Sequence, residues 1–145
     1  MANAPSQDLK DILVTAGLGT FAHGTEDSTW GIYISKEPDE PNKIITLYDK
    51  GGSSPNPKWI LDEPTVRIRV RGAKMGYQDA WTKIEAVKDA LLGITPQTVN
   101  GTYYTGILMI GDITFIHYDD NNRPIFTSTW QVIREPATST YRTGL

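Results

Sequence analysis

The amino-acid sequence predicts an α+β domain in which two helices pack on one face of a mainly antiparallel sheet. Two segments carry apolar residues at helical spacing, and several others alternate apolar and polar residues as strands do. Two helices are too few for a doubly wound parallel sheet. The length of 145 residues suits one hydrophobic core. We expect one domain over residues 1–135 and a C-terminal tail, 136–145, with too little apolar content to pack alone.

The first helix is predicted to begin at Ser6 and to end before Gly17. Serine is a preferred N-cap residue, and Asp8 places a negative charge near the positive end of the helix dipole. The apolar stripe of this helix consists of Leu9, Ile12, Leu13 and Ala16. Because so short a helix is marginal by itself in water, its stripe must pack on the sheet.

Three strands are predicted before the second helix, at residues 30–34, 44–48 and 66–71. The apolar side chains recur at period two in these segments. Residues 51–57 contain only Gly, Ser, Pro and Asn. They cannot gain stability from apolar burial, so we expect an exposed excursion there.

The strand at 66–71 carries the first candidate interaction site. Its apolar residues are predicted to face the core, which leaves Arg67, Arg69 and Arg71 in a row on the outer face, about 6.8 Å apart. A solvated outer face is common in antiparallel sheets. The alternative is an interface with an acidic protein surface, because arginine is enriched at interfaces and forms bidentate pairs with carboxylates.

The second half of the chain is predicted to form a long helix and then a β-hairpin. Residues 77–92 show helical spacing and precede Gly93, a typical C-cap residue. Strands are expected at 102–110, 113–118 and 126–132. The acidic turn at 119–124 is expected to join the last two, and its Asp and Asn side chains can cap their own backbone. One face of the final strand consists of Phe126, Ser128, Trp130 and Val132.

The composition argues against several classes of function. The formal net charge is -3, so the chain lacks the basic excess that drives binding to nucleic-acid backbones. It has no cysteine, which rules out disulfides, thiolate metal ligands and cysteine nucleophiles. We predict neither a signal peptide nor a membrane-spanning segment, and expect a soluble intracellular product.

The motifs that could carry chemistry have simpler interpretations. Residues 17–22 spell G-x-G-x-x-A, but they follow a helix, whereas a dinucleotide site needs them between a strand and a helix. His117, Asp119 and Asp120 could bind a cation, but the turn lacks the Gly and Glu of a calcium loop, which favours a plain hairpin turn. Neither histidine lies in a catalytic motif. The sequence therefore predicts no enzyme, no metal site and no cofactor.

Trp59 lies between a proline-rich and an acidic segment. An exposed tryptophan would be a strong interface anchor, since aromatic residues dominate many binding energies. A core position is the alternative, and the sequence favours neither.

The order of these features resembles the minor capsid and tail terminator proteins of long-tailed bacteriophages over about residues 9–135. One specific feature is the acidic-proline step at 62–64, which leads into the arginine-bearing strand and Gly72. The other is the acidic turn with Arg123, which precedes a strand ending in 132–135.

The resemblance implies a non-enzymatic subunit that assembles as a ring, usually a hexamer, on the head-proximal end of the tail tube. Such a ring stops tube polymerisation and presents a surface for head-tail joining. The implied partners are other copies of the chain, the tail tube protein and a connector or stopper protein, with DNA only passing through the ring. The implied location is the neck of the virion, after assembly in the host cytoplasm. The residues we expect at its interfaces are Arg67, Arg69, Arg71, Trp59, Asp119, Asp120 and Arg123.

Two other kinds of function stay open from the sequence. A head-side completion protein of the connector would dock on the portal instead of the tail tube. The other alternative is a generic α+β binding module or a small hydrolase, which a concave pocket would distinguish from a subunit that caps the tube. A hydrolase would gather His117, an acid and a nucleophile in one concave site.

Overall fold

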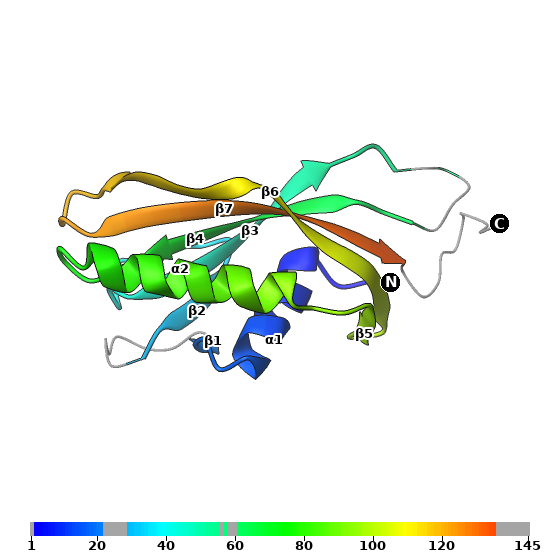
Figure 1. Ribbon diagram of the computed structural model, residues 1–145, viewed down its shortest axis with the longest axis horizontal. Coiled ribbons are helices and arrows are strands. Elements are labelled where there is room, and N and C mark those ends of the chain that lie inside the picture. The colour runs from blue at the N-terminus through cyan, green and yellow to red at the C-terminus, as the bar shows by residue number, and fades with distance from the viewer. Residues whose placement is uncertain (1, 22–28, 56, 58–60, 136–145) are drawn as a thin grey trace.

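Two helices and seven strands make up the described part of the chain (Figure 1). The structure, a computed structural model, describes residues 2–21, 29–55, 57 and 61–135. In chain order the elements are α1 (Pro5–Thr15), β1 (Thr20–Phe21), β2 (Gly31–Ile34), β3 (Ile44–Gly52), β4 (Pro64–Arg71), α2 (Tyr77–Leu92), β5 (Gln97–Val99), β6 (Thr102–Tyr118) and β7 (Pro124–Glu135). The predicted α+β class is confirmed.

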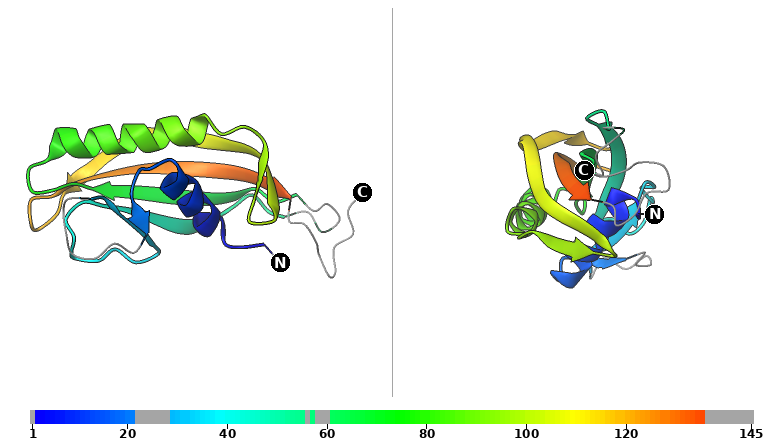
Figure 2. Two further views of the ribbon diagram at one scale, coloured as in Figure 1. Left: turned by 90° about the horizontal axis from the view of Figure 1, so that it is seen from below. Right: turned by 90° about the vertical axis from the view of Figure 1, so that its right-hand side faces the viewer.

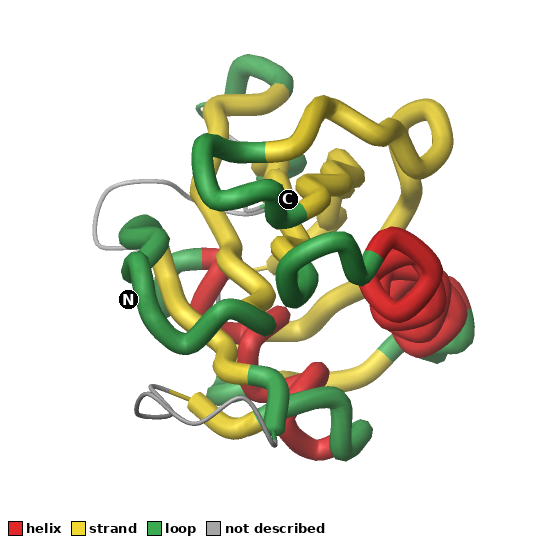
Figure 3. Tube along the Cα trace, turned by 90° about the vertical axis from the view of Figure 1, so that its left-hand side faces the viewer, coloured by secondary structure: helices red, strands yellow, loops and turns green. Residues whose placement is uncertain are grey.

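The described strands form one sheet in the order β1-β2-β3-β4-β7-β6-β5. The pairs β1–β2 and β2–β3 are parallel, and all other neighbours are antiparallel. Views from the two ends of the molecule show that the sheet is strongly curled (Figures 2 and 3). The predicted mainly antiparallel sheet is present, together with two parallel pairs that the pattern did not predict.

Both helices and the sheet contribute to one hydrophobic cluster. The members from the helices are Leu9, Ile12, Leu13, Ala80, Ile84, Val87 and Leu91. The members of the predicted inner face of β7, Phe126, Ser128, Trp130 and Val132, are all buried. The Trp130 indole N–H donates to the Ser128 hydroxyl at 2.9 Å, so the serine supplies the acceptor that a buried indole needs.

The start of α1 is capped by a residue from a distant strand. The N-cap residue is Ala4, so the prediction of Ser6 as N-cap is wrong. The backbone N–H and the hydroxyl of Ser6 donate to the two carboxylate oxygens of Asp49, at 3.0 and 2.7 Å. Asp49 lies on β3, so the tertiary fold places this carboxylate at the positive end of the helix. The helix stops before Gly17, as predicted, and that glycine has a φ of 77°.

A buried polar cluster joins α1 to β6 and β7. Asp8 is fully buried and accepts hydrogen bonds from the Tyr104 hydroxyl and from Asn100 Nδ2, the latter at 2.8 Å. Arg134 Nη1 lies 3.7 Å from Asp8 Oδ2 and donates to the Asn3 carbonyl at 2.7 Å. Burial, and then the bond to Asp8, raise the pKa of Tyr104, so its hydroxyl stays protonated and donates.

The β3 strand is longer than predicted. It continues from Tyr48 to Gly52, so two residues of the expected excursion belong to the sheet. The remaining described residues of that segment, 53–55 and 57, are exposed. The predicted tail, 136–145, and Trp59 lie outside the described residues.

The two strands predicted at 102–110 and 113–118 form one strand, β6. Its register against β7 shifts between Ile110 and Thr114, where Gly111 takes a φ of 71°. A bulge of this kind bends a strand without ending it. The short strands β1 and β5 were not predicted, because two or three residues show no periodicity.

Candidate protein-interaction site

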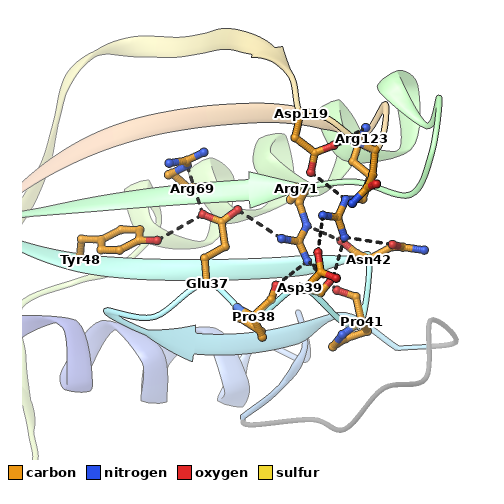
Figure 4. Close-up of polar contacts among 11 residues, drawn as sticks. Glu37, Pro38, Asp39, Pro41, Asn42, Tyr48, Arg69, Arg71, Asp119 and Arg123 are labelled. Atoms are coloured by element: carbon orange, nitrogen blue, oxygen red, sulfur yellow. Dashed lines mark hydrogen bonds and ion pairs between the residues drawn. The ribbon is translucent and has the colours of Figure 1, made fainter.

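The loop 35–43, which joins β2 to β3, is fixed to the sheet by Arg71 (Figure 4). Arg71 ends β4 and is 4% exposed. Its Nη2 donates to the backbone carbonyls of Pro38 and Pro41 at 2.7 and 2.8 Å, and its Nε donates to that of Asn42 at 3.2 Å. A guanidinium has five N–H donors in a rigid fork and no acceptor, which suits a cage of carbonyl oxygens. Arg71 therefore holds the loop instead of presenting its charge to solvent.

Arg123 holds the same loop from the β6–β7 turn, and it is also 4% exposed. Its Nη1 donates to the Asp39 carbonyl at 2.6 Å and to Asn42 Oδ1 at 3.1 Å. Its Nη2 lies 3.1 Å from Asp39 Oδ1 and its Nε 2.8 Å from Asp119 Oδ2. Burial, and then the nearby Arg123 charge, lower the pKa of Arg71, and the surrounding carboxylates oppose that effect. The two arginines and the loop 35–43 form one unit, which we call the arginine clamp.

Asp119 organises the turn from which Arg123 projects. Its Oδ1 accepts the backbone N–H groups of Asn121 and Arg123, both at 2.9 Å. Burial alone would raise the pKa of Asp119, but these donors and the Arg123 guanidinium outweigh it and hold the pKa below its usual value. The acidic turn therefore caps its own backbone, as the sequence predicts.

Glu37 links the loop to the outer face of the sheet, the face opposite the hydrophobic cluster (Figure 4). Its Oε2 accepts a hydrogen bond from the Tyr48 hydroxyl at 3.2 Å and lies 3.5 Å from Arg69 Nε. Its Oε1 lies 3.5 Å from Arg71 Nη1. Burial, and then the Glu37 charge, raise the pKa of Tyr48, so the phenol stays a donor. Arg69 is therefore paired within its own chain, and its side chain is 29% exposed.

The structure separates the arginines that the sequence placed in one exposed row. Arg67 is exposed, Arg69 is partly buried against Glu37, and Arg71 is buried. The prediction that all three face solvent is therefore wrong for Arg71. The reason is the loop 35–43, which covers one end of the outer face.

The charged residues of the acidic turn also differ in their exposure to solvent. Asp120 is exposed, whereas Asp119 and Arg123 are engaged in the arginine clamp. His117 Nδ1 lies 2.8 Å from the backbone oxygen of Tyr118. Within the described residues, no three His, Cys, Asp or Glu side chains are grouped so as to hold a metal ion. Neither described helix is long and apolar enough to cross a membrane.

Comparison with known families settles the class of protein. The family model described as "Bacteriophage tail terminator protein" matches residues 12–136, which include the last four residues of α1, all of α2 and every described strand. The chain belongs to the bacteriophage tail terminator family. It is therefore a structural protein of a phage tail, and the resemblance found in the sequence is confirmed.

A solved structure supports the fold of this tail terminator. A chain of "Virion of native gene transfer agent (GTA) particle" is similar with a TM-score of 0.67 and 14% sequence identity. The similarity covers 91% of this chain and 95% of that chain. No curated protein matches the chain.

The tail terminator chain has a second surface that sequence reasoning missed. Large apolar side chains on β6 are 37% to 50% exposed, namely Tyr103, Leu108, Ile110, Phe115, Ile116 and Tyr118. The sequence contains an indication of this surface, because residues 107–110 are apolar without interruption. Since successive residues of a strand point to opposite faces, such a run places apolar side chains on both faces.

Proposed function

We propose that copies of this chain form a hexameric ring that closes the head-proximal end of the tail tube, stops tube polymerisation and offers the surface for head-tail joining. The observation that carries the proposal is the family match over residues 12–136. Its partners would be further copies of the chain, the tail tube protein and a connector or stopper protein. Its place would be the neck of the virion, after assembly in the host cytoplasm.

We infer that the two helices cover one face of the sheet and leave part of the other face free for partners. In support, α1 and α2 share one hydrophobic cluster with inward-facing strand residues. Arg67 is exposed on the outer face, in register with Tyr48 on β3 and Thr129 on β7. Its guanidinium suits a carboxylate on a partner surface.

A ring of identical subunits needs two different patches on each copy, since its contacts are head to tail. Arg67 on the sheet face and Asp120 on the β6–β7 turn are exposed and of opposite charge. We assign them to interfaces of the ring, together with Trp59, which lies outside the described residues. Arg71, Asp119 and Arg123 act indirectly, because they shape the loop and the turn that flank this face.

The test is the capping of isolated tail tubes by the purified chain. Sedimentation velocity gives the mass of the chain alone, and negative-stain images show where it binds. We expect rings or caps at one end of each tube, and no elongation of capped tubes when tube protein is added. Uncapped tubes that keep elongating would contradict the proposal. Binding to the portal of heads but not to tubes would identify a head-side completion protein.

A matched pair of variants tests Arg67. Arg67→Glu and Lys74→Glu make the same change of charge at exposed positions. We expect Arg67→Glu to weaken capping about tenfold, the effect of losing about 1.4 kcal/mol of binding free energy. Lys74→Glu should cap like the wild type. Equal capping by the two variants would remove Arg67 from the interface.

A further inference from the structure

Exposed apolar side chains are concentrated on one strand of the molecule. Eleven large apolar side chains of the described residues are exposed, and six of them lie on β6. A further one, Tyr77, stands beside it, since the Tyr77 ring packs against Phe115 with centroids 5.2 Å apart. The register places Leu108 and Ile110 opposite Gln131 and Thr129, on the outer face, and Phe115 opposite the buried Phe126, on the face that bears the hydrophobic cluster. Both faces of β6 therefore expose apolar side chains, and soluble monomers rarely leave extensive apolar surface uncovered.

The same strand has an unpaired edge. One side of β6 pairs with β7 from Tyr103 to Tyr118. On its other side β5 pairs only with residues 102–104, and no described strand pairs with 105–118. In Figure 1, β6 runs in yellow along the border of the sheet. The backbone N–H and C=O groups along such an edge are a template for another chain.

β6 has few of the features that usually prevent an edge strand from pairing with another chain. Lysine, proline and inward charges commonly guard such edges, but β6 contains neither Lys, Arg, Glu nor Pro. Its one acidic residue, Asp112, sits in the bulge and pairs with Lys88 Nζ at 3.0 Å. The bulge interrupts the middle of the edge and leaves the exposed side chains on either side of it uncovered.

We propose that the β6 edge, residues 105–118, is the surface by which one copy of this chain binds a second copy. Charge is one reason, because the single carboxylate of β6 is paired within its own chain, so identical subunits can approach here without repulsion. Composition is another, because interfaces between identical subunits are more apolar than those of transient complexes. The inference rests on the proposed function in one respect, which is that copies of this chain contact one another.

The exposed apolar side chains of β6 supply part of the area that contact with a second copy requires. Six side chains exposed by about two fifths to one half present on the order of 500 Å². A stable interface takes roughly 800 Å² from each partner. This apolar area is divided between the two faces of β6, so a second copy that pairs with the edge buries part of it, and the backbone edge and the neighbouring polar residues supply further contact.

The double variant Leu108→Lys/Ile110→Lys tests the surface. Both side chains are 50% exposed, so the fold should tolerate the change, and thermal unfolding verifies it. The control is Leu92→Lys, a residue of α2, outside β6, that is 51% exposed. Sedimentation velocity over a concentration series should show roughly hundredfold weaker self-association of the double variant, as when two apolar interface contacts are replaced by charges. Leu92→Lys should associate like the wild type.

Amide hydrogen exchange of the wild-type chain gives an independent reading. Peptides within 105–118 should gain protection when the chain is assembled, compared with the dilute chain. Assembly of the double variant at wild-type concentration, or unchanged protection of 105–118 in assembled wild type, would overturn the β6 proposal. If tubes are nevertheless capped, the proposed function stands. A wild-type chain that neither self-associates nor caps tubes would overturn both.

Discussion

Replacement of Arg71 by leucine tests the arginine clamp, the contact that shapes the outer face. Leucine fills much of the same space but donates no hydrogen bond. The carbonyls of Pro38, Pro41 and Asn42 then lose their donor, and Glu37 loses one of its two cationic neighbours. The loop 35–43 should loosen while β4 keeps its place in the sheet.

The size of the effect follows from these contacts. A hydrogen bond to a charged group contributes about 1.5–3 kcal/mol, and removal of one member of a buried ionic cluster costs about 3–5 kcal/mol. The freed carbonyls recover some water as the loop moves, so we expect a loss of about 3 kcal/mol in the free energy of unfolding. Arg71→Lys keeps the positive charge, but lysine has only one nitrogen to donate to the loop carbonyls. The loss in the free energy of unfolding should therefore be intermediate, about 2 kcal/mol.

Urea unfolding measures these differences. The intrinsic fluorescence of the buried Trp30 and Trp130 follows the transition, and an unchanged slope shows that the midpoint reports stability. Arg67→Leu is the control, because it makes the same substitution in the same strand at an exposed position, where the change should stay within about 0.5 kcal/mol. The clamp would be refuted if Arg71→Leu were no less stable than Arg67→Leu.

Three further predictions concern other parts of the fold. Asp8→Asn removes the charge that faces Arg134 in a buried site, and should lower the unfolding free energy by about 2–3 kcal/mol; a melting temperature equal to wild type would contradict it. Asp119 has a lowered pKa, so its stabilisation is present above 3.8, its ordinary value, and is lost as the pH falls through the lower folded value. Asp119→Asn should therefore flatten the acid side of a plot of stability against pH, and parallel curves for the two proteins would count against this reasoning. Gly52→Ala should destabilise by about 2 kcal/mol, because φ is 129° and an added Cβ would lie 2.4 Å from the Glu63 carbonyl oxygen; thermal unfolding checks it, with Gly51→Ala as the unhindered control.

Much of the secondary structure could be predicted because periodicity is a local property. The helix at 77–92 has the predicted bounds, and the inner faces of β4 and β7 are the predicted ones. Turn chemistry is equally local, so the Asp119 carboxylate caps the β6–β7 turn as expected.

The cap of α1 could not be predicted in this way. Ser6 meets Asp49, which lies 43 residues further along the chain, and no local pattern encodes that contact. The same holds for Tyr104 and Asp8, which are 96 residues apart. Such pairs arise only when packing has brought the helix and the strands together.

The sequence by itself determined which side chains of β4 and β7 point inward, and that the chain resembles phage tail terminators. Only the tertiary structure decided which outward side chains remain exposed. Arg67 and Arg71 are equivalent in the alternating pattern, yet the loop 35–43 folds over one and leaves the other in solvent. In the same way, only the strand pairing shows that no described strand covers β6 beyond Tyr104 on the side away from β7. The physical reason is that the direction of a side chain follows from backbone geometry, whereas its cover depends on segments that arrive from elsewhere in the chain.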